Sequence, residues 1–159
     1  MLWKEVVESP QLKNLPYKIE TNEWGQIVMT PARVRHGNYQ YKIGNLLGSL
    51  HPQAGEIVME CAVRTAKGTK AADVAWFSTA RWLIVEDDFE TSIAPEICVE
   101  VLSPGNTGGE MKSKRKLYFE AGALEVWVCN TEGHMRFYDQ SGELEQSQLV
   151  PAFPQNIRK

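Results

Sequence analysis

The segment PEICVEVLSP, residues 95–104, constrains the fold more than any other part of the chain. Its apolar residues are typical of a strand that is covered on both faces of a sheet: Ile97, Cys98, Val99, Val101 and Leu102. Glu100 is the single acid among them, and a buried carboxylate is costly unless a partner compensates its charge. The segment therefore predicts a central buried strand and a charged partner for Glu100.

The residues after this strand predict a strand–helix–strand unit. Residues 103–109 form a loop rich in glycine, residues 110–122 have a helical pattern that Gly122 can end, and residues 125–130 again resemble a buried strand. Two strands joined by a helix of this length lie parallel, with a right-handed crossover. This unit indicates an α/β protein.

The rest of the chain supplies further strands and one more helix. We expect a hairpin over residues 17–30 with a turn at 22–25, a helix over 38–50 capped by Asn38, and strands over 56–66 and 71–78. Residues 79–94 are expected to be irregular, and residues 134–139 to pair with the segment after Gly142. The prediction is an α/β mixed sheet flanked by helices, with hairpins at both ends. Its length suits one domain over residues 1–159.

Charge and cysteine content narrow the class of protein. The net charge of -3 gives no global basic field, so any contact with nucleic acid needs a local patch. Cys61, Cys98 and Cys129 have no CxxC spacing and are expected to be buried free thiols in a reducing compartment, rather than zinc ligands. We find neither a signal-peptide profile nor an apolar run that spans a membrane, and we expect a cytoplasmic protein.

Three polar residues point toward the predicted sheet. By strand alternation, Asp73 shares a face with Ala71, Ala75 and Phe77, and Glu100 shares one with Cys98 and Leu102. Two acids on neighbouring strands repel each other, and Mg²⁺ or Mn²⁺ between them removes the conflict. Lys114 lies on the inward stripe of the 110–122 helix with Met111, Leu117, Tyr118 and Ala121, so we expect it close to Glu100.

Each of these patterns also has a purely structural interpretation. An acid in a strand is often an edge residue or a salt-bridge partner, and aspartate at the start of a strand is common. The run KSKRK, residues 112–116, is by default a solvated helix face, although it can also contact phosphates. His36 is by default a loop histidine.

The order of these motifs resembles the Uma2 family of restriction-endonuclease-like proteins. The strings VEVLSP and KRKLYFEAGALEVWV carry the resemblance through Glu100, Ser103, Pro104, Lys114, Tyr118, Gly122, Glu125 and Trp127. Earlier matches are Ala72, Asp73 and Val74, and at the N-terminal side Glu20, Gly25, Ile27, Met29, Pro31 and His36. The resemblance covers residues 17–139, and the order and spacing of the motifs are more specific than any single one.

This resemblance implies the PD-(D/E)XK nuclease fold, with an αβββαβ core, and a divalent-metal site. Asp73 and Glu100 would bind Mg²⁺ or Mn²⁺, with the Val101 carbonyl as a further ligand. Lys114 would replace the family's usual lysine two positions after the glutamate, where this chain has Leu102. Glu20, His36 and Tyr118 would be supporting residues.

The implied activity is hydrolysis of DNA phosphodiester bonds. Lys112, Arg115 and Lys116 would follow the DNA backbone. The chain could also form a homodimer, because nucleases that cut both strands often dimerise, but the sequence leaves the oligomeric state open. Trp3, Trp24 and Trp82 could form that dimer surface or cover the ends of the sheet. Two departures from the family pattern, Ala72 for a proline and Asn130 for an aspartate, leave the central groups present.

Two other functions remain open at this point. The chain could be a non-catalytic interaction module on the same fold, in which Lys114 and Glu100 form a structural ion pair. It could also be a metal-dependent hydrolase of a smaller phosphoester.

Overall fold

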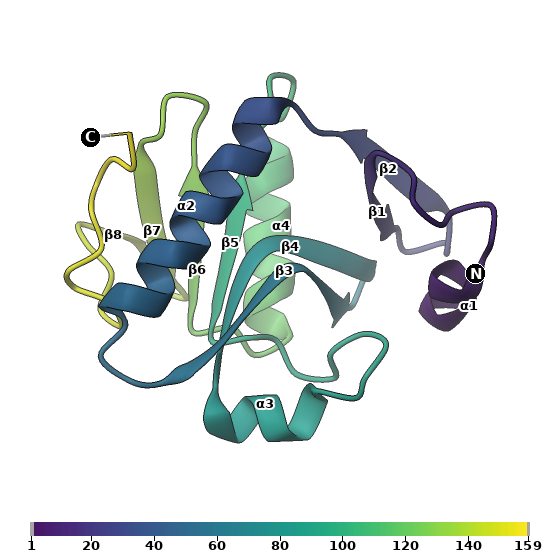
Figure 1. Cartoon of the computed structure of the whole chain (residues 1–159), viewed down its shortest axis with the longest axis horizontal. Helices are drawn as coiled ribbons and strands as arrows, with labels where there is room; N and C mark the ends of the chain where they lie inside the picture. The colour runs from purple at the N-terminus through teal and green to yellow at the C-terminus, as the bar shows by residue number, and fades with distance from the viewer. Residues whose placement is uncertain (1, 159) are drawn as a thin grey trace.

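The structure, a computed structural model, describes residues 2–158. Its helices are α1 (Trp3–Glu8), α2 (Val34–Leu50), α3 (Thr79–Val85) and α4 (Gly108–Glu120). Its strands are β1 (Tyr17–Thr21), β2 (Ile27–Pro31), β3 (Gly55–Thr65), β4 (Gly68–Ser78), β5 (Ile97–Val101), β6 (Glu125–Cys129), β7 (Met135–Asp139) and β8 (Gly142–Leu144). Figure 1 shows their arrangement.

Strands β3 to β8 form one mixed sheet. They lie side by side in chain order, six in all, and every neighbouring pair is antiparallel except β5 and β6. Helix α4 connects these two parallel strands, and β1 pairs with β2 in a separate hairpin. The mixed sheet, the connecting helix and both hairpins confirm the predicted fold class.

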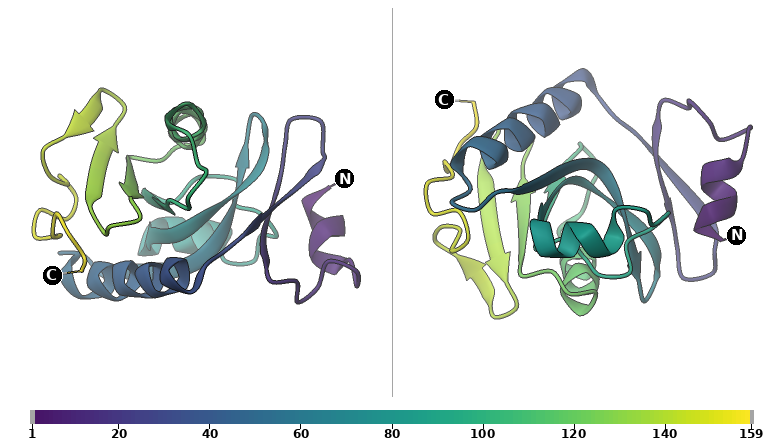
Figure 2. Two further views of the ribbon diagram at one scale, coloured as in Figure 1. Left: turned by 90° about the horizontal axis from the view of Figure 1, so that it is seen from above. Right: turned by 60° about the horizontal axis from the view of Figure 1, so that its bottom comes forward.

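Helices cover both faces of the sheet. Helix α2 crosses one face and α4 lies on the other, as Figures 1 and 2 show. The apolar stripe of α2, which includes Tyr39, Ile43 and Leu47, packs against one side of β4, β5 and β6. Tyr118 of α4 and Val85 of α3 pack into the core on the opposite side. Because both faces are covered, β5 and β6 are buried along their whole length.

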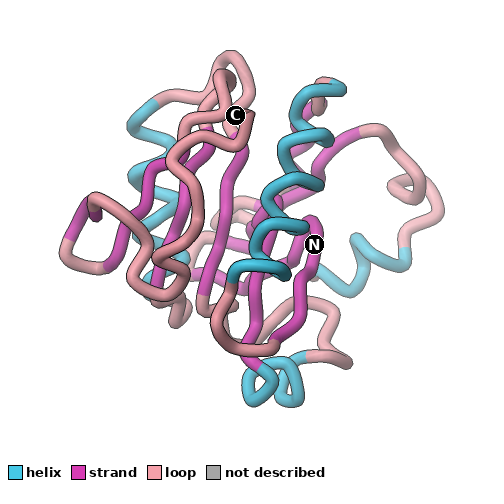
Figure 3. Tube along the Cα trace, turned by 60° about the vertical axis from the view of Figure 1, so that its left-hand side comes forward, coloured by secondary structure: helices cyan, strands magenta, loops and turns pink. Residues whose placement is uncertain are grey.

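The C-terminal segment, residues 145–158, runs along the outer strands of the sheet as a loop (Figure 3). Val150, Phe153 and Ile157 anchor it in the core beside α2. The Met135 amide also donates a hydrogen bond to the Gln155 carbonyl, 2.8 Å away. This segment therefore completes one core layer without forming a regular element.

Strands β4 and β5 diverge after a short pairing. Strand β4 has 11 residues, but β5 pairs with it only at Val74, Ala75 and Trp76. The hairpin β1–β2 lies beside the first half of β4, which does not pair with β5, and is held there by side chains. Thr21 Oγ1 accepts a hydrogen bond from the Thr69 amide at 2.8 Å. The divergence leaves a gap into which polar groups of both strands can point.

The structure corrects several boundaries predicted from the sequence. Helix α2 begins at Val34, after Arg33, so Asn38 lies inside the helix and is not its cap. Residues 79–94 are not wholly irregular, because α3 begins after Ser78, whose hydroxyl accepts from the Arg81 amide. The highly exposed side chains of Leu83 and Ile84 obscured the helical period there.

Two further points differ from the sequence analysis. Helix α1 was not predicted. In β4, Ala72 joins Ala75 and Phe77 in the core on the α4 side, where strict alternation had placed Ala71. Glu60, which has a positive φ of 49°, and Asp73 do not take part in the β3–β4 pairing. The alternation of the β4 side chains between the two faces of the sheet changes at this position.

The cysteines and helices bear on two other predictions. Cys61, Cys98 and Cys129 are buried free thiols, as expected. Among residues 2–158, none of the helices combines the length and apolar character that crossing a membrane requires.

Candidate functional site

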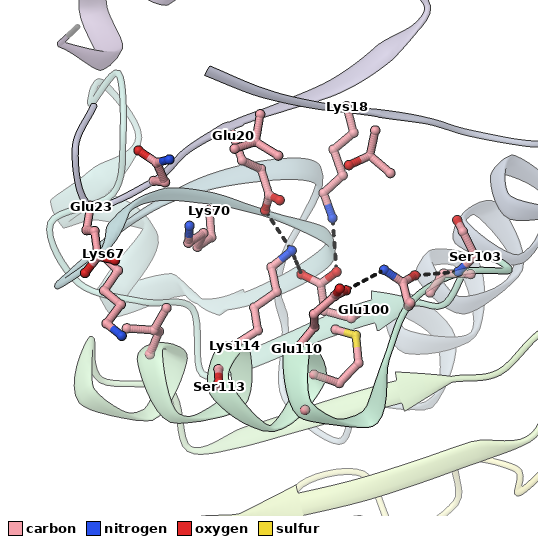
Figure 4. A pocket seen from close by; sticks show the side chains of 18 of the residues that line it. Lys18, Glu20, Glu23, Lys67, Lys70, Glu100, Ser103, Glu110, Ser113 and Lys114 are labelled. Atoms are coloured by element: carbon pink, nitrogen blue, oxygen red, sulfur yellow. Dashed lines mark hydrogen bonds and ion pairs between the residues drawn. The ribbon is translucent and has the colours of Figure 1, made fainter. Parts of the chain in front are cut away.

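A cavity of about 580 Å³ lies where β4 and β5 diverge. Residues of β1, β5 and α4 line it, and Figure 4 shows their charged side chains pointing toward one another. Four of these groups, together with the buried Asp73, form what we call the carboxylate–lysine cluster: Lys18, Glu20, Asp73, Glu100 and Lys114. They come from four different elements, so the tertiary fold assembles the cluster.

Asp73 lies at an interruption of the sheet. It lies just beyond the Val74–Val99 pair, where the pairing of β4 with β5 ends, and Glu100 holds the corresponding place on β5. Its Oδ2 accepts a hydrogen bond from the Val101 amide at 2.8 Å, so the side chain bridges the two strands after their backbones separate. Asp73 is 0% exposed, and its Oδ1 has no well-directed hydrogen bond among the described residues.

Three donor groups contact Glu100, and they supply the charged partner that its position in a buried strand requires. Lys18 Nζ lies 3.0 Å from Oε2, and Lys114 Nζ lies 3.2 Å from Oε1. The Tyr118 hydroxyl also donates to Oε1 at 2.6 Å. The helical spacing predicted Lys114 close to Glu100, and the structure brings these two side chains together.

Glu20 connects the hairpin to the cluster. Its Oε2 accepts the Ala71 amide at 2.7 Å and lies 2.7 Å from Lys114 Nζ. Lys114 therefore bridges Glu20 of β1 and Glu100 of β5. Glu20, to which the family resemblance assigned a supporting role, is thus itself a member of the cluster.

Lys18 is the central residue that the sequence analysis missed. Its Nζ lies 3.1 Å from Asp73 Oδ1 and 3.0 Å from Glu100 Oε2, between the two acids assigned to metal binding. Lys18 precedes Glu20 by two positions in β1, and the strand period places both side chains on one face. That spacing was the available signal.

His36 contacts Asp73 from the first turn of α2, and not from a loop. Its Nε2 lies 3.4 Å from Asp73 Oδ2, and the ring is buried. The hydrogen bond to Asp73 and the charge of this carboxylate raise the pKa of His36 above its ordinary value, although burial opposes the shift. His36 thus contacts Oδ2 of Asp73, whereas Lys18 contacts Oδ1 of the same carboxylate.

Burial and mutual charge set the protonation states in the cluster. Burial alone would raise the pKa of Asp73, but the charge of Lys18 and the contact with His36 outweigh it and lower that pKa. Burial dominates at Glu100 and raises its pKa in spite of the two lysines. Burial would lower the pKa of Lys18, yet the charges of Glu100 and Asp73 raise it, so the ammonium stays charged.

The donor set fits a hard divalent cation with two protein carboxylates. Among residues 2–158, no three His, Cys, Asp or Glu side chains are arranged as a metal cage. Asp73 Oδ1 and Glu100 Oε2 nevertheless lie close enough to share one cation, because both contact the Lys18 ammonium, at 3.1 and 3.0 Å. Mg²⁺ is commonly bound through one or two carboxylates, with water and substrate phosphate as the other ligands. The two carboxylates therefore suit a metal site in which water and substrate phosphate supply the other ligands.

The helical cations assigned to DNA lie away from this cavity. Lys112 is exposed, Lys116 lies 3.9 Å from Glu120, and the Arg115 guanidinium stacks 3.9 Å from the centre of the Tyr138 ring. The lysines that line the cavity outside the cluster are Lys67 and Lys70, which the sequence analysis did not select.

The tryptophans assigned to a dimer surface differ in their surroundings. Trp24 is 76% exposed at the turn of the β1–β2 hairpin. Trp82 is half-buried and packs against Phe77, with 5.8 Å between ring centres, so it covers the core beneath α3. Trp3 is half-buried in α1. The homodimer stays a prediction.

The comparisons with known proteins agree with this architecture. The sequence profile of the Uma2 family, described as "putative restriction endonuclease", matches residues 4–157. A crystal structure titled as a putative nuclease belonging to DUF820 from Anabaena variabilis has a similar fold, with a TM-score of 0.74 and 17% sequence identity. The similarity covers 99% of this chain and 96% of that one.

No curated protein matches the chain significantly. The family profile, however, spans nearly all of the residues described above, including every member of the carboxylate–lysine cluster. The sequence match and the nuclease-like fold lead to one conclusion: the chain belongs to the Uma2 family.

Proposed function

We propose that this protein is a divalent-metal-dependent nuclease that hydrolyses DNA phosphodiester bonds. One observation carries the proposal. Asp73 and Glu100, on adjacent strands beside a cavity, both contact the Lys18 ammonium, and Lys114 Nζ lies 3.2 Å from Glu100, in a chain of a restriction-endonuclease-like family. Two carboxylates with a lysine are the groups that metal-assisted phosphodiester hydrolysis uses.

Asp73, Glu100 and the Val101 carbonyl would hold Mg²⁺ or Mn²⁺. When bound, the ion would lower the pKa of a ligated water and polarise a phosphate oxygen. Tyr118 fixes Glu100 through its hydroxyl, and His36 fixes Asp73. These contacts orient the two carboxylates before substrate arrives, which reduces the reorganisation that the reaction requires.

Lys114 would act on the substrate phosphate. Its ammonium stands between Glu20 and Glu100 and faces the cavity. From that position it can orient the attacking water or stabilise negative charge that develops on the phosphate. Glu20 keeps the ammonium in place, so we assign Glu20 a positioning role.

Phosphates of the DNA backbone would follow the lysines around the cavity. Lys67 and Lys70 line its rim, whereas Lys112, Arg115 and Lys116 are a second set of cations on α4, outside the cavity. Such contacts give affinity that does not depend on sequence and that falls with salt.

Calorimetric titration with Mn²⁺, with plasmid cleavage on the same samples, tests the proposal. We expect the wild type to bind Mn²⁺ and nick plasmid, and Glu100→Gln to lose both. The matched control is Glu23→Gln, an exposed acid that lines the same cavity outside the carboxylate–lysine cluster. Cleavage that survives in Glu100→Gln would contradict the assignment.

A non-catalytic interaction module is the second candidate. The observation in its favour is that Lys18 and Lys114 already neutralise Glu100 by ion pairs within the chain. If neither the wild type nor Glu23→Gln binds Mn²⁺ while both remain folded, the ion pairs are structural and this second function is preferred.

A further inference from the structure

We propose that the Lys18 ammonium occupies the divalent-cation position between Asp73 and Glu100, so that metal binding requires Lys18 to leave. This inference rests on the proposed metal site and assigns a role to Lys18 that goes beyond it. In the metal-free protein, Lys18 would be the resident counter-ion of the two acids.

The first argument for this exchange is the position of the Lys18 ammonium. Lys18 Nζ is 3.1 Å from Asp73 Oδ1 and 3.0 Å from Glu100 Oε2. These are one oxygen from each of the two carboxylates assigned to the metal, and both distances are those of direct ion pairs. A cation ligated by the same two oxygens would have to occupy the space that Nζ fills.

The charge balance carries the second step. When His36 is neutral, the carboxylate–lysine cluster sets three carboxylates, Glu20, Asp73 and Glu100, against two ammonium groups. Exchange of the Lys18 ammonium for a divalent ion balances these charges. Retention of both cations would place excess positive charge in a buried site, where such charge is costly. Exchange is therefore favoured over simultaneous occupancy.

The third argument is that the cavity gives the Lys18 side chain room to move away from the two acids. Its side chain is 10% exposed and lines the 580 Å³ cavity, whereas Asp73 is fully buried beneath it. The ammonium therefore separates Asp73 from the cavity. The open volume in front of it gives the long side chain room to rotate away without displacing core residues.

The hairpin itself can stay in place during this exchange. Neighbouring residues of β1 anchor it independently: Glu20 accepts the Ala71 amide, and Thr21 Oγ1 accepts the Thr69 amide. Lys70 Nζ also donates to the Thr21 carbonyl at 2.8 Å. The moving part is thus one side chain, and removal of its charge should not detach the hairpin.

Mn²⁺ titration of Lys18→Met tests the inference. We expect Lys18→Met to bind Mn²⁺ about tenfold more tightly than the wild type or better, because the competing cation is gone. Without metal, it should melt at a lower temperature than the wild type, and Mn²⁺ should raise its Tm by more. The matched control is Lys67→Met, which removes an ammonium from the same cavity and should leave Mn²⁺ affinity unchanged.

A second measurement uses the wild type alone, in case Lys18→Met does not fold. Acylation of lysine amines, followed by mass spectrometry, reports the exposure of each ammonium. Saturating Mg²⁺ should speed the modification of Lys18 several-fold and leave that of exposed Lys112 unchanged. An unchanged rate at Lys18 under conditions where calorimetry detects binding would overturn the inference.

The other outcomes separate this inference from the proposed function. Equal Mn²⁺ affinity in the wild type and Lys18→Met, with binding abolished by Glu100→Gln, would retain the metal site and overturn the role of Lys18. Weaker binding in Lys18→Met would also overturn it, because Lys18 would then support the metal. Absence of binding in all variants would overturn both.

Discussion

Buried acids in this protein are satisfied in two different ways. Glu100 and Asp73 are held by charged partners and lie beside a cavity. Glu125 is equally buried, at 2% exposure, but neutral donors surround it. Trp127 Nε1 and the Ser147 hydroxyl donate to its Oε1, and the Gln148 and Leu149 amides donate to Oε2. Glu125 is therefore a structural anchor for the C-terminal segment.

We expect Glu125→Gln to lower the free energy of unfolding by about 2 kcal/mol. One carboxylate oxygen would become an amide nitrogen that faces buried N–H or O–H donors and leaves them unsatisfied. Urea denaturation measures the loss, and Mn²⁺ affinity should stay at the wild-type value. Unchanged stability would contradict the anchoring role.

The contact between His36 and Asp73 predicts a pH-dependent stability. Because the folded-state pKa of His36 is raised, its contribution is fully present below the unfolded value of about 6.5. The contribution is lost as pH rises through the folded-state pKa. The wild type should therefore exceed His36→Gln in stability most at acidic pH, and the difference should shrink above about pH 6.5.

Urea denaturation of both proteins across this pH range measures the difference. His134→Gln, a substitution of an exposed histidine before β7, is the matched control. A difference that widens with rising pH would mean that His36 is neutral when it contacts Asp73.

At the scale of elements, the β1–β2 hairpin brings Lys18 and Glu20 to the main sheet. The hairpin meets the start of β4 at Gly68, which has a φ of +90°. A Cβ atom there would lie 2.5 Å from the carbonyl oxygens of Thr21 and Asn22. Only glycine allows both this backbone conformation and this close approach.

We expect Gly68→Ala to destabilise the protein by about 1–3 kcal/mol and to loosen the hairpin. Urea denaturation gives the first effect, and faster proteolysis within residues 9–31 gives the second. Gly37→Ala is the control, because a Cβ there meets nothing within 4 Å inside helix α2. It should be neutral or stabilising by up to about 1 kcal/mol. Equal effects of both substitutions would argue against the close approach at Gly68.

At the scale of the whole molecule, the net negative charge repels nucleic acid, so a local positive charge must attract it. The chain carries a formal charge of -3, so binding to DNA has to come from the lysines near the cavity and along α4. The two sets lie on different surfaces. Their separate contributions decide which surface the DNA follows.

The salt dependence of binding to a duplex oligonucleotide separates these surfaces. We expect Lys67→Ala to reduce the slope of log affinity against log salt by about one, because one phosphate contact is lost. Lys116→Ala should change the slope less, since Lys116 lies 3.9 Å from Glu120 on the outer face of α4. The reverse order would place the DNA on that outer face.

Local patterns in the sequence were sufficient for the strands and for helices α2 and α4, although not for α1 and α3. The apolar runs gave the buried strands, the stripe with Met111, Leu117 and Tyr118 gave the inward face of α4, and Gly122 ended this helix with a positive φ of 115°. These features depend on neighbours within a few residues. The predicted cap at Asn38 was wrong because α2 begins at Val34 without a side-chain cap, and α3 was missed because Leu83 and Ile84 are exposed.

The sequence alone determined the order of the strands and of helices α2 and α4, and it singled out Asp73, Glu100 and Lys114 as polar groups directed at the sheet. Only the tertiary structure decided what lies between the two acids. Lys18 is 82 residues from Glu100 in sequence, and its position depends on where β4 and β5 diverge and how the hairpin docks. Periodicity encodes the face on which a side chain lies, whereas the contacts between distant segments are set by packing.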